Sequence, residues 1–230
     1  MQANLLYEIE NDTEDKFLDK VIYEQPLNER MRILMRLEFS FNQANYHLHG
    51  ESPLASRATM DSILDIINIF TRTELKNEVL KELERHAGVL ARLEQSPAVD
   101  IVRLSNILEK IEPIVEKLRD LPSPVAQDLR NNEFINAVRQ RSSIPGGNIG
   151  FDLPIYHYWL SQPAKQRIEA LSAWLSEFEV IHQGVDLVLE MLRESAIPTR
   201  AVARGGFYKH SLDPASPCQL VRIALPDKSD

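Results

Sequence analysis

The chain has 230 residues, of which 43% are hydrophobic, and its formal net charge is −8 at pH 7. This length suits one large domain or two small ones, and the acidic total argues against a general nucleic-acid-binding protein. A single cysteine, Cys218, excludes an internal disulfide and a structural zinc site built from several cysteines.

The first 19 residues form an acidic leader that we expect to be mobile. Eight acidic and three basic residues lie within residues 1–30, so this stretch carries most of the negative charge. The triplet Leu5-Leu6-Tyr7 could add a short strand, but the run after it is too charged to bury. No secretory signal and no apolar run of about 20 residues is recognised, so we expect a soluble, cytoplasmic protein without membrane insertion.

Helical periodicity dominates residues 25–198, where apolar side chains recur every three or four positions. The first predicted helix carries one apolar stripe, and the second is apolar on more than one side, as a buried helix would be. Thr71 and Glu74 predict a capping box at the start of the third helix, whose charged residues, including Glu82 and Arg85, we interpret as solvated. Other residues expected to begin, end or interrupt helices are Asn28, Gly50, Pro53, Asp100, Pro113, Pro122, Ser161 and Pro198.

Three short segments have the composition of β-strands: Val21-Ile22-Tyr23, Gly206-Phe207-Tyr208-Lys209 and residues 219–225. The last of these alternates, so that one of its faces is apolar. We therefore predict a mainly α fold of the α+β class. A helical bundle of residues 25–198 is joined to a small antiparallel β domain built from residues 20–24 and 199–230.

No combination of residues predicts catalysis. The glycine-rich segment 144–150 lacks the lysine and hydroxyl residue of a phosphate-binding loop, so we interpret it as an ordered connector. His47 and His49 would lie on different faces of a helix, and no cysteine or carboxylate group supports a metal site there. We expect no enzyme activity, no metal and no cofactor.

Two segments are together more specific than any of these patterns. The first is Val21–Arg32, with the sequence VIYEQPLNERMR, and the second is Val138–Gly147, with the sequence VRQRSSIPGG, followed by FDLP at 151–154 and by His157. In this order they resemble the ZapD family, the bacterial FtsZ-ring-associated cell division proteins. The resemblance covers roughly residues 20–225.

The resemblance implies a homodimer that binds the acidic C-terminal tail of FtsZ and bundles FtsZ filaments at midcell. Family members normally continue with further β-strands, so we expect a β domain shortened at its C-terminus. Charge steers an acidic peptide and apolar side chains supply most of the affinity, so we expect a basic shelf beside an apolar groove. Each basic candidate, taken singly, is also explained as an ordinary solvated charge. The candidate tail-binding residues are Arg72, Lys76, Arg204, Lys209 and Arg222.

A different class of function stays open beside this one. A helical enzyme or ligand-binding domain could have a pocket around Asp152, Tyr156, His157 and Trp159. The aromatic residues here, Tyr156, Tyr158 and Trp159, are first interpreted as a cluster that faces the core. A buried polar pocket with a converging acid and base would favour that alternative. Arg139 and Arg141 are interpreted as structural, either capping helix carbonyls or pairing with Asp152.

Overall fold

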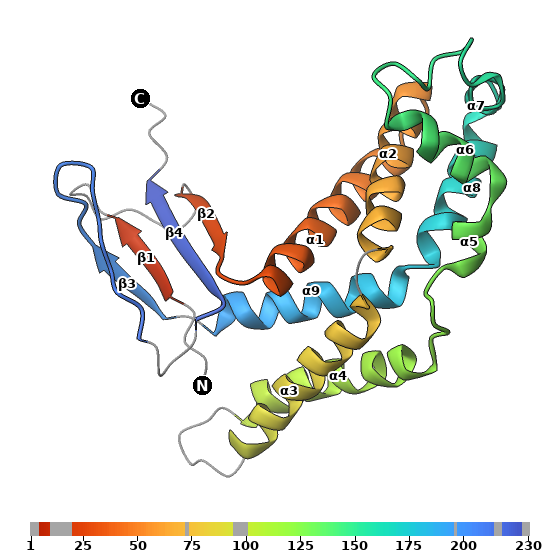
Figure 1. Cartoon of the computed structure of the whole chain (residues 1–230). Helices are drawn as coiled ribbons and strands as arrows, with labels where there is room; N and C mark the ends of the chain where they lie inside the picture. The colour runs from red at the N-terminus through yellow and green to blue at the C-terminus, as the bar shows by residue number, and fades with distance from the viewer. Residues whose placement is uncertain are drawn as a thin grey trace. The chain divides into compact units, whose positions relative to one another are not determined.

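A computed structural model of the chain describes residues 5–9, 20–71, 74–93, 101–195, 197–213 and 218–226. Helices make up most of this part of the chain, and the strands are short (Figure 1). The predicted mainly α fold with a small β-sheet is therefore confirmed. In chain order the elements are β1 (Leu5–Ile9), β2 (Lys20–Pro26), α1 (Glu29–Leu48), α2 (Pro53–Phe70), α3 (Leu75–Leu93), α4 (Ile101–Asp120), α5 (Gln127–Asn131), α6 (Glu133–Ser142), α7 (Pro154–Leu160), α8 (Ala164–Ser176), α9 (Glu179–Glu194), β3 (Pro198–Ala201) and β4 (Leu220–Pro226).

The chain divides into two compact units. The β unit comprises Met1–Met35 and Leu187–Asp230, and the helical unit comprises Arg36–Asp186. Both divisions fall inside helices, α1 and α9, whereas the sequence-based boundaries lie at the ends of the strands. The two sets of boundaries differ because they depend on different properties. The sequence-based boundaries follow the change from helical to strand periodicity, whereas the units are defined by which residues contact one another.

The sheet of the β unit has the strand order β2-β4-β1-β3. The predicted antiparallel pairing holds for β2 with β4, while β1 runs parallel to both β4 and β3, so the sheet is mixed. Leu5–Ile9 is therefore a strand, which agrees with the short strand considered at Leu5-Leu6-Tyr7 but not with a leader that is mobile throughout. The strand continues through Glu8 to Ile9, beyond the apolar triplet, because a strand with a neighbour on each side gains backbone hydrogen bonds whatever its side chains are. Residues 1–4 and 10–19 of the leader lie outside the described residues.

Apolar side chains at the predicted helical positions form the core. The stripe Met31, Leu34, Leu37, Phe41 and Ala44 of α1 is almost completely buried. The second helix is buried on more than one side, as its composition predicted. It begins at Pro53, with the hydroxyl oxygen of Ser52 accepting a hydrogen bond from the Ala55 N–H at 3.1 Å. None of the described helices is both long and apolar enough to cross a bilayer.

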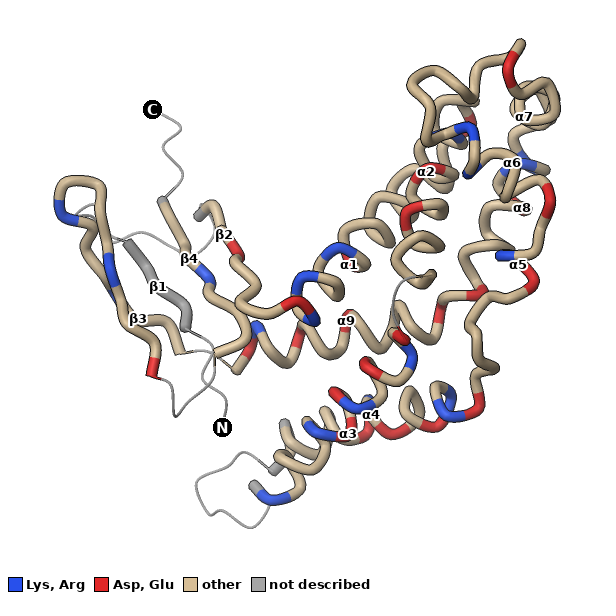
Figure 2. Tube along the Cα trace, viewed as in Figure 1, with Lys and Arg blue, Asp and Glu red and all other residues tan. Residues whose placement is uncertain are grey.

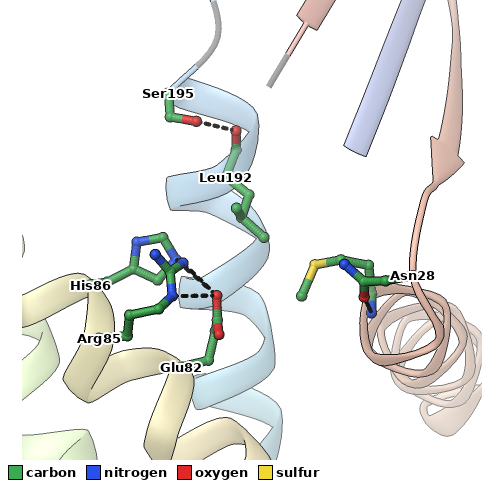
Figure 3. Close-up of polar contacts among 7 residues, drawn as sticks. Asn28, Glu82, Arg85, His86, Leu192 and Ser195 are labelled. Carbon is green, nitrogen blue, oxygen red and sulfur yellow. Dashed lines mark hydrogen bonds and ion pairs between the residues drawn. The ribbon is translucent and has the colours of Figure 1, made fainter. Parts of the chain in front are cut away.

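The start of α3 corrects two predictions. Thr71 does not cap this helix, because its N–H and hydroxyl bond to carbonyls of α2 and it ends that helix instead. Glu82 is 1% exposed rather than solvated. Figure 3 shows it beside Arg85 and His86, with the Arg85 Nε donating to its carboxylate at 3.1 Å and the His86 Nε2 lying 3.5 Å from the same oxygen. A carboxylate on the inward side of a helix needs such partners.

Candidate partner-binding surface

A tight turn follows β3 at Arg204–Phe207. The two end residues form an antiparallel bridge, and the Phe207 N–H donates to the Arg204 carbonyl at 3.2 Å. The residues between them, Gly205 and Gly206, have φ values of +63° and +79°. Two successive positive φ values are typical of a type I′ turn and favour glycine at both positions. The turn therefore holds Arg204 directly opposite Phe207. It replaces the strand that the sequence predicted at 206–209.

Cations and large apolar side chains alternate around this turn. Phe207 is 71% exposed and Val202 is 63% exposed, and the side chains of Arg204 and Lys209 are exposed beside them. Figure 2 shows the basic positions of β3 and the loop after it. We call residues 199–212 the β3 loop surface. Its chemistry, positive charge next to exposed apolar groups, complements an acidic peptide with apolar side chains.

Arg222 has a different environment from the one its sequence suggested. It lies on β4 opposite Glu24 of β2, and its Nε donates to the Glu24 carboxylate at 2.8 Å. Arg193, near the end of α9, donates to both oxygens of the same carboxylate at 2.9 and 2.8 Å. Burial raises the pKa of Glu24, but the hydrogen bonds and charges of Arg193 and Arg222 outweigh it, so the pKa lies below its ordinary value. Arg222 is thus held in a largely buried ion pair within the β unit.

Lys76 lies in the first turn of α3, in the helical unit. Its Nζ donates to the carbonyl of Arg119 at 3.2 Å and also to that of Leu121, so it caps the C-terminal end of α4. Lys76 also lines a groove of about 340 Å³ together with Arg130 and Glu74. Arg72 lies outside the described residues. The β unit accordingly carries Arg204, Lys209 and Arg222, and the helical unit carries Lys76.

The four residues of the alternative pocket do not converge. Tyr156 is completely buried, whereas His157, next to it on α7, is exposed. The Tyr156 ring stacks on Trp159 with their centroids 5.8 Å apart, and Phe134 and Trp174 pack against Trp159 at 5.7 and 5.8 Å. Tyr156 and Trp159 thus belong to a packed aromatic cluster built from α6, α7 and α8, as first interpreted, and this cluster contains no facing acid and base. Tyr158, which the same interpretation placed in the core, is 69% exposed.

The glycine-rich connector, residues 144–150, is held against α2 by an arginine that the sequence analysis did not identify. Arg57 of α2 donates to the Asn148 carbonyl at 3.2 Å, and its guanidinium lies 4.9 Å from the centre of the Tyr156 ring. Burial raises the pKa of Tyr156 well above its ordinary value. Arg139 lines a separate groove of about 410 Å³ with Asp61 and Asp65. Neither Arg139 nor Arg141 makes the pair with Asp152 that the sequence suggested, among the contacts of the described residues.

The fold and the surface define an α+β protein with an exposed loop after β3 that carries cations beside large apolar side chains. The chain belongs to the ZapD family: a family model described as "ZapD: Cell division protein" matches residues 35–230. Relatives named Cell division protein ZapD include one from Methylococcus capsulatus, 36% identical over 90% of this chain and 82% of its own length. Another, from Coxiella burnetii, is 37% identical over 90% of this chain and 80% of its own. A third, from Aromatoleum aromaticum, is 38% identical over 82% and 74%. Membership of this family supports a role in cell division.

Proposed function

We propose that the protein binds the acidic C-terminal tail of FtsZ and cross-links FtsZ filaments at the cytoplasmic division site, without catalysing a reaction. The observation that carries this proposal is the Arg204–Phe207 turn, which holds a cation and an exposed aromatic ring opposite each other. Family membership and the resemblance of the two sequence segments support FtsZ as the partner.

The β3 loop surface supplies the two contributions that such a peptide needs. Arg204 and Lys209 attract the acidic tail and increase the rate of encounter, an effect that falls as salt screens the charges. Phe207 and Val202 supply apolar area that becomes buried on binding. Aromatic and arginine side chains recur among the few residues that dominate binding energies, so Phe207 and Arg204 are the proposed anchors.

The other basic candidates have less direct roles in the proposed binding of the tail. Arg222, through its ion pair with Glu24, positions β4 within the sheet and adds to the positive potential of the β unit. Lys76 and Arg72 stay proposed tail contacts on the helical unit, considered by itself. Reversing the charge at Arg222 would also break the Glu24 ion pair, so that variant confounds stability with binding and is a poor first test.

Cross-linking requires two tail sites on one particle. A symmetric dimer provides them with one kind of interface, and two linked sites also raise the effective affinity for a filament that displays many tails. We therefore include homodimerisation in the proposed function.

Binding of a fluorescent FtsZ tail peptide, followed by anisotropy at low salt, tests the surface directly. Arg204→Glu and Lys209→Glu should each weaken binding by about tenfold, and Phe207→Ala should weaken it with little change in its salt dependence. Lys165→Glu is the matched control, because Lys165 is an exposed lysine of α8 in the helical unit. Equal affinities for wild type and the three loop variants would show that the tail does not bind here.

A further inference from the structure

The groove of about 410 Å³ in the helical unit has charged side chains on both of its walls. One wall is a single face of α2, because Asp61, Leu64, Asp65 and Asn68 are spaced by three or four residues. The other wall is the end of α6 with the glycine-rich connector, from Arg139 to Asn148. This second wall includes most of the segment with the sequence VRQRSSIPGG, which has no part in the proposed binding of the FtsZ tail.

The two carboxylates of the α2 wall are exposed and lack a partner. Within the described part of the chain, neither Asp61 nor Asp65 accepts a hydrogen bond or forms an ion pair. Arg57 precedes Asp61 by one helical turn, but its guanidinium donates to the Asn148 carbonyl. Partial burial raises the pKa of both aspartates, and the charge of Arg57 offsets this only in part at Asp61. A cation in the groove would therefore stabilise both carboxylates.

The α6 wall contributes one charged side chain to the groove, the half-buried Arg139. It forms no ion pair with Asp61 or Asp65 among the contacts of the described residues, so its guanidinium donors stay available to a ligand. α6 ends at Ser142, and the partial negative charge of its last carbonyls lies at this wall as well. The groove thus offers acceptors for a cation and, separately, donors for an oxygen.

We propose that this groove binds an extended segment of a partner protein through a lysine or arginine side chain of that segment. The carboxylates of α2 bind the cationic head. The methylene stem lies on Leu64, Ile144 and Pro145, since long basic side chains bury their stems on apolar surface. Arg139 donates to a backbone carbonyl of the bound segment.

The charges of the groove select a basic partner segment rather than the acidic FtsZ tail. Two carboxylates and a helix C-terminus outweigh the single guanidinium, so the potential of the groove is negative and repels an acidic peptide. Most of the lining is exposed, which suits a stretch of chain better than an enclosed small molecule. Among the described residues, no group of three or more His, Cys, Asp and Glu side chains could hold a metal ion there instead.

Nuclear magnetic resonance of the isotope-labelled chain at low salt tests the groove with small probes. N-acetyl-lysine methylamide has the ammonium, the stem and two carbonyls, and N-acetyl-norleucine methylamide has the same stem without the charge. The lysine compound should shift the amide signals of residues 61–68 and 139–148 in a saturable way. The norleucine compound should bind about fivefold more weakly or worse, because the charge-assisted contact is missing.

Matched variants test the two walls separately. Asp61→Asn combined with Asp65→Asn should weaken binding of the lysine compound by about tenfold. Asp120→Asn should leave it unchanged, because Asp120 is an exposed aspartate of the same unit that does not line the groove. Arg139→Gln should weaken binding of the lysine compound but not of n-butylammonium, which has no carbonyl to accept from the guanidinium.

Urea unfolding of the double variant distinguishes a binding role from a structural one. Burial raises the pKa of Asp61 and Asp65, so their charges oppose folding at neutral pH, and Asp61→Asn with Asp65→Asn should keep or raise the unfolding midpoint. A lower midpoint would make these carboxylates structural and overturn the proposal. Equal binding of the lysine and norleucine compounds, no shifts at the groove, or an unchanged affinity of the double variant would overturn it too.

Discussion

Arg167 of α8 is 3% exposed, yet all of its hydrogen-bond partners are neutral. Its Nε donates to the Gln162 carbonyl at 3.0 Å and its Nη2 to the Glu51 carbonyl at 2.6 Å. Its Nη1 donates to the Ser52 carbonyl at 3.2 Å and to the Ser56 hydroxyl. The guanidinium thereby ties the turn before α8 to the loop that starts α2.

Arg167→Met removes these donors, so the Gln162 and Glu51 carbonyls lose their bonds to the guanidinium, while the Ser52 carbonyl still accepts from the Ser56 N–H. A hydrogen bond from a charged donor contributes ~1.5–3 kcal/mol net, while removal of a desolvated charge returns part of that loss. We expect the free energy of unfolding to fall by about 2–3 kcal/mol, because hydrogen bonds from a charged donor are lost but no partner charge is left unpaired. Arg167→Lys keeps the charge but cannot reach all the carbonyls, so it should be intermediate.

Urea unfolding followed by circular dichroism measures these losses. Hydrogen exchange should also accelerate at the start of α2, where the Ala55 N–H depends on the position of Ser52. Arg92→Met is the matched control, because Arg92 is an exposed arginine whose Nε donates to the Gly88 carbonyl of its own helix. A loss below about 1 kcal/mol for Arg167→Met, equal to that of the control, would refute this account of the buried arginine.

Three further predictions concern the β unit and the helical core. Since the pKa of Glu24 is lowered in the folded chain, its ion pairs stabilise fully above the ordinary value of 4.5, and this contribution is lost as the pH falls through the lower folded value. The stability difference between wild type and Glu24→Gln should shrink accordingly in acid unfolding curves. Gly206→Ala should destabilise the turn by ~1–2 kcal/mol, seen as faster exchange of the Phe207 N–H, because φ is +79° there. Gly184→Leu should cost at least ~2 kcal/mol in urea unfolding, since even a Cβ would lie 2.7 Å from a Val79 methyl, whereas Gly88→Leu should cost nothing.

Local patterns in the sequence predicted the elements that depend on local interactions. The apolar stripes of α1 and α2 and the strands around Val21 and Val221 lie where periodicity indicated. The error at Thr71 also concerns a local interaction. A threonine hydroxyl can donate to a carbonyl of the helix that ends there as well as accept from an N–H of the helix that follows.

The interactions that were not predicted join residues far apart in the chain. Glu24 and Arg222 are 198 positions apart, and Arg167 bonds to carbonyls 115 and 116 positions away. The sequence around an arginine does not distinguish a solvated side chain from one that is buried in such a network. The burial of Glu82 was missed because its position on α3 satisfied the pattern of a charged face equally well.

The proposed function is that the chain joins FtsZ filaments through their tails. Co-pelleting with polymerised FtsZ, with and without its C-terminal tail, measures this most directly. We expect the protein to pellet with intact filaments, and we expect pelleting to be abolished by removing the tail or by combining Arg204→Glu with Lys209→Glu. Pelleting to the same extent with tail-less filaments, or unchanged pelleting of the double variant, would contradict it.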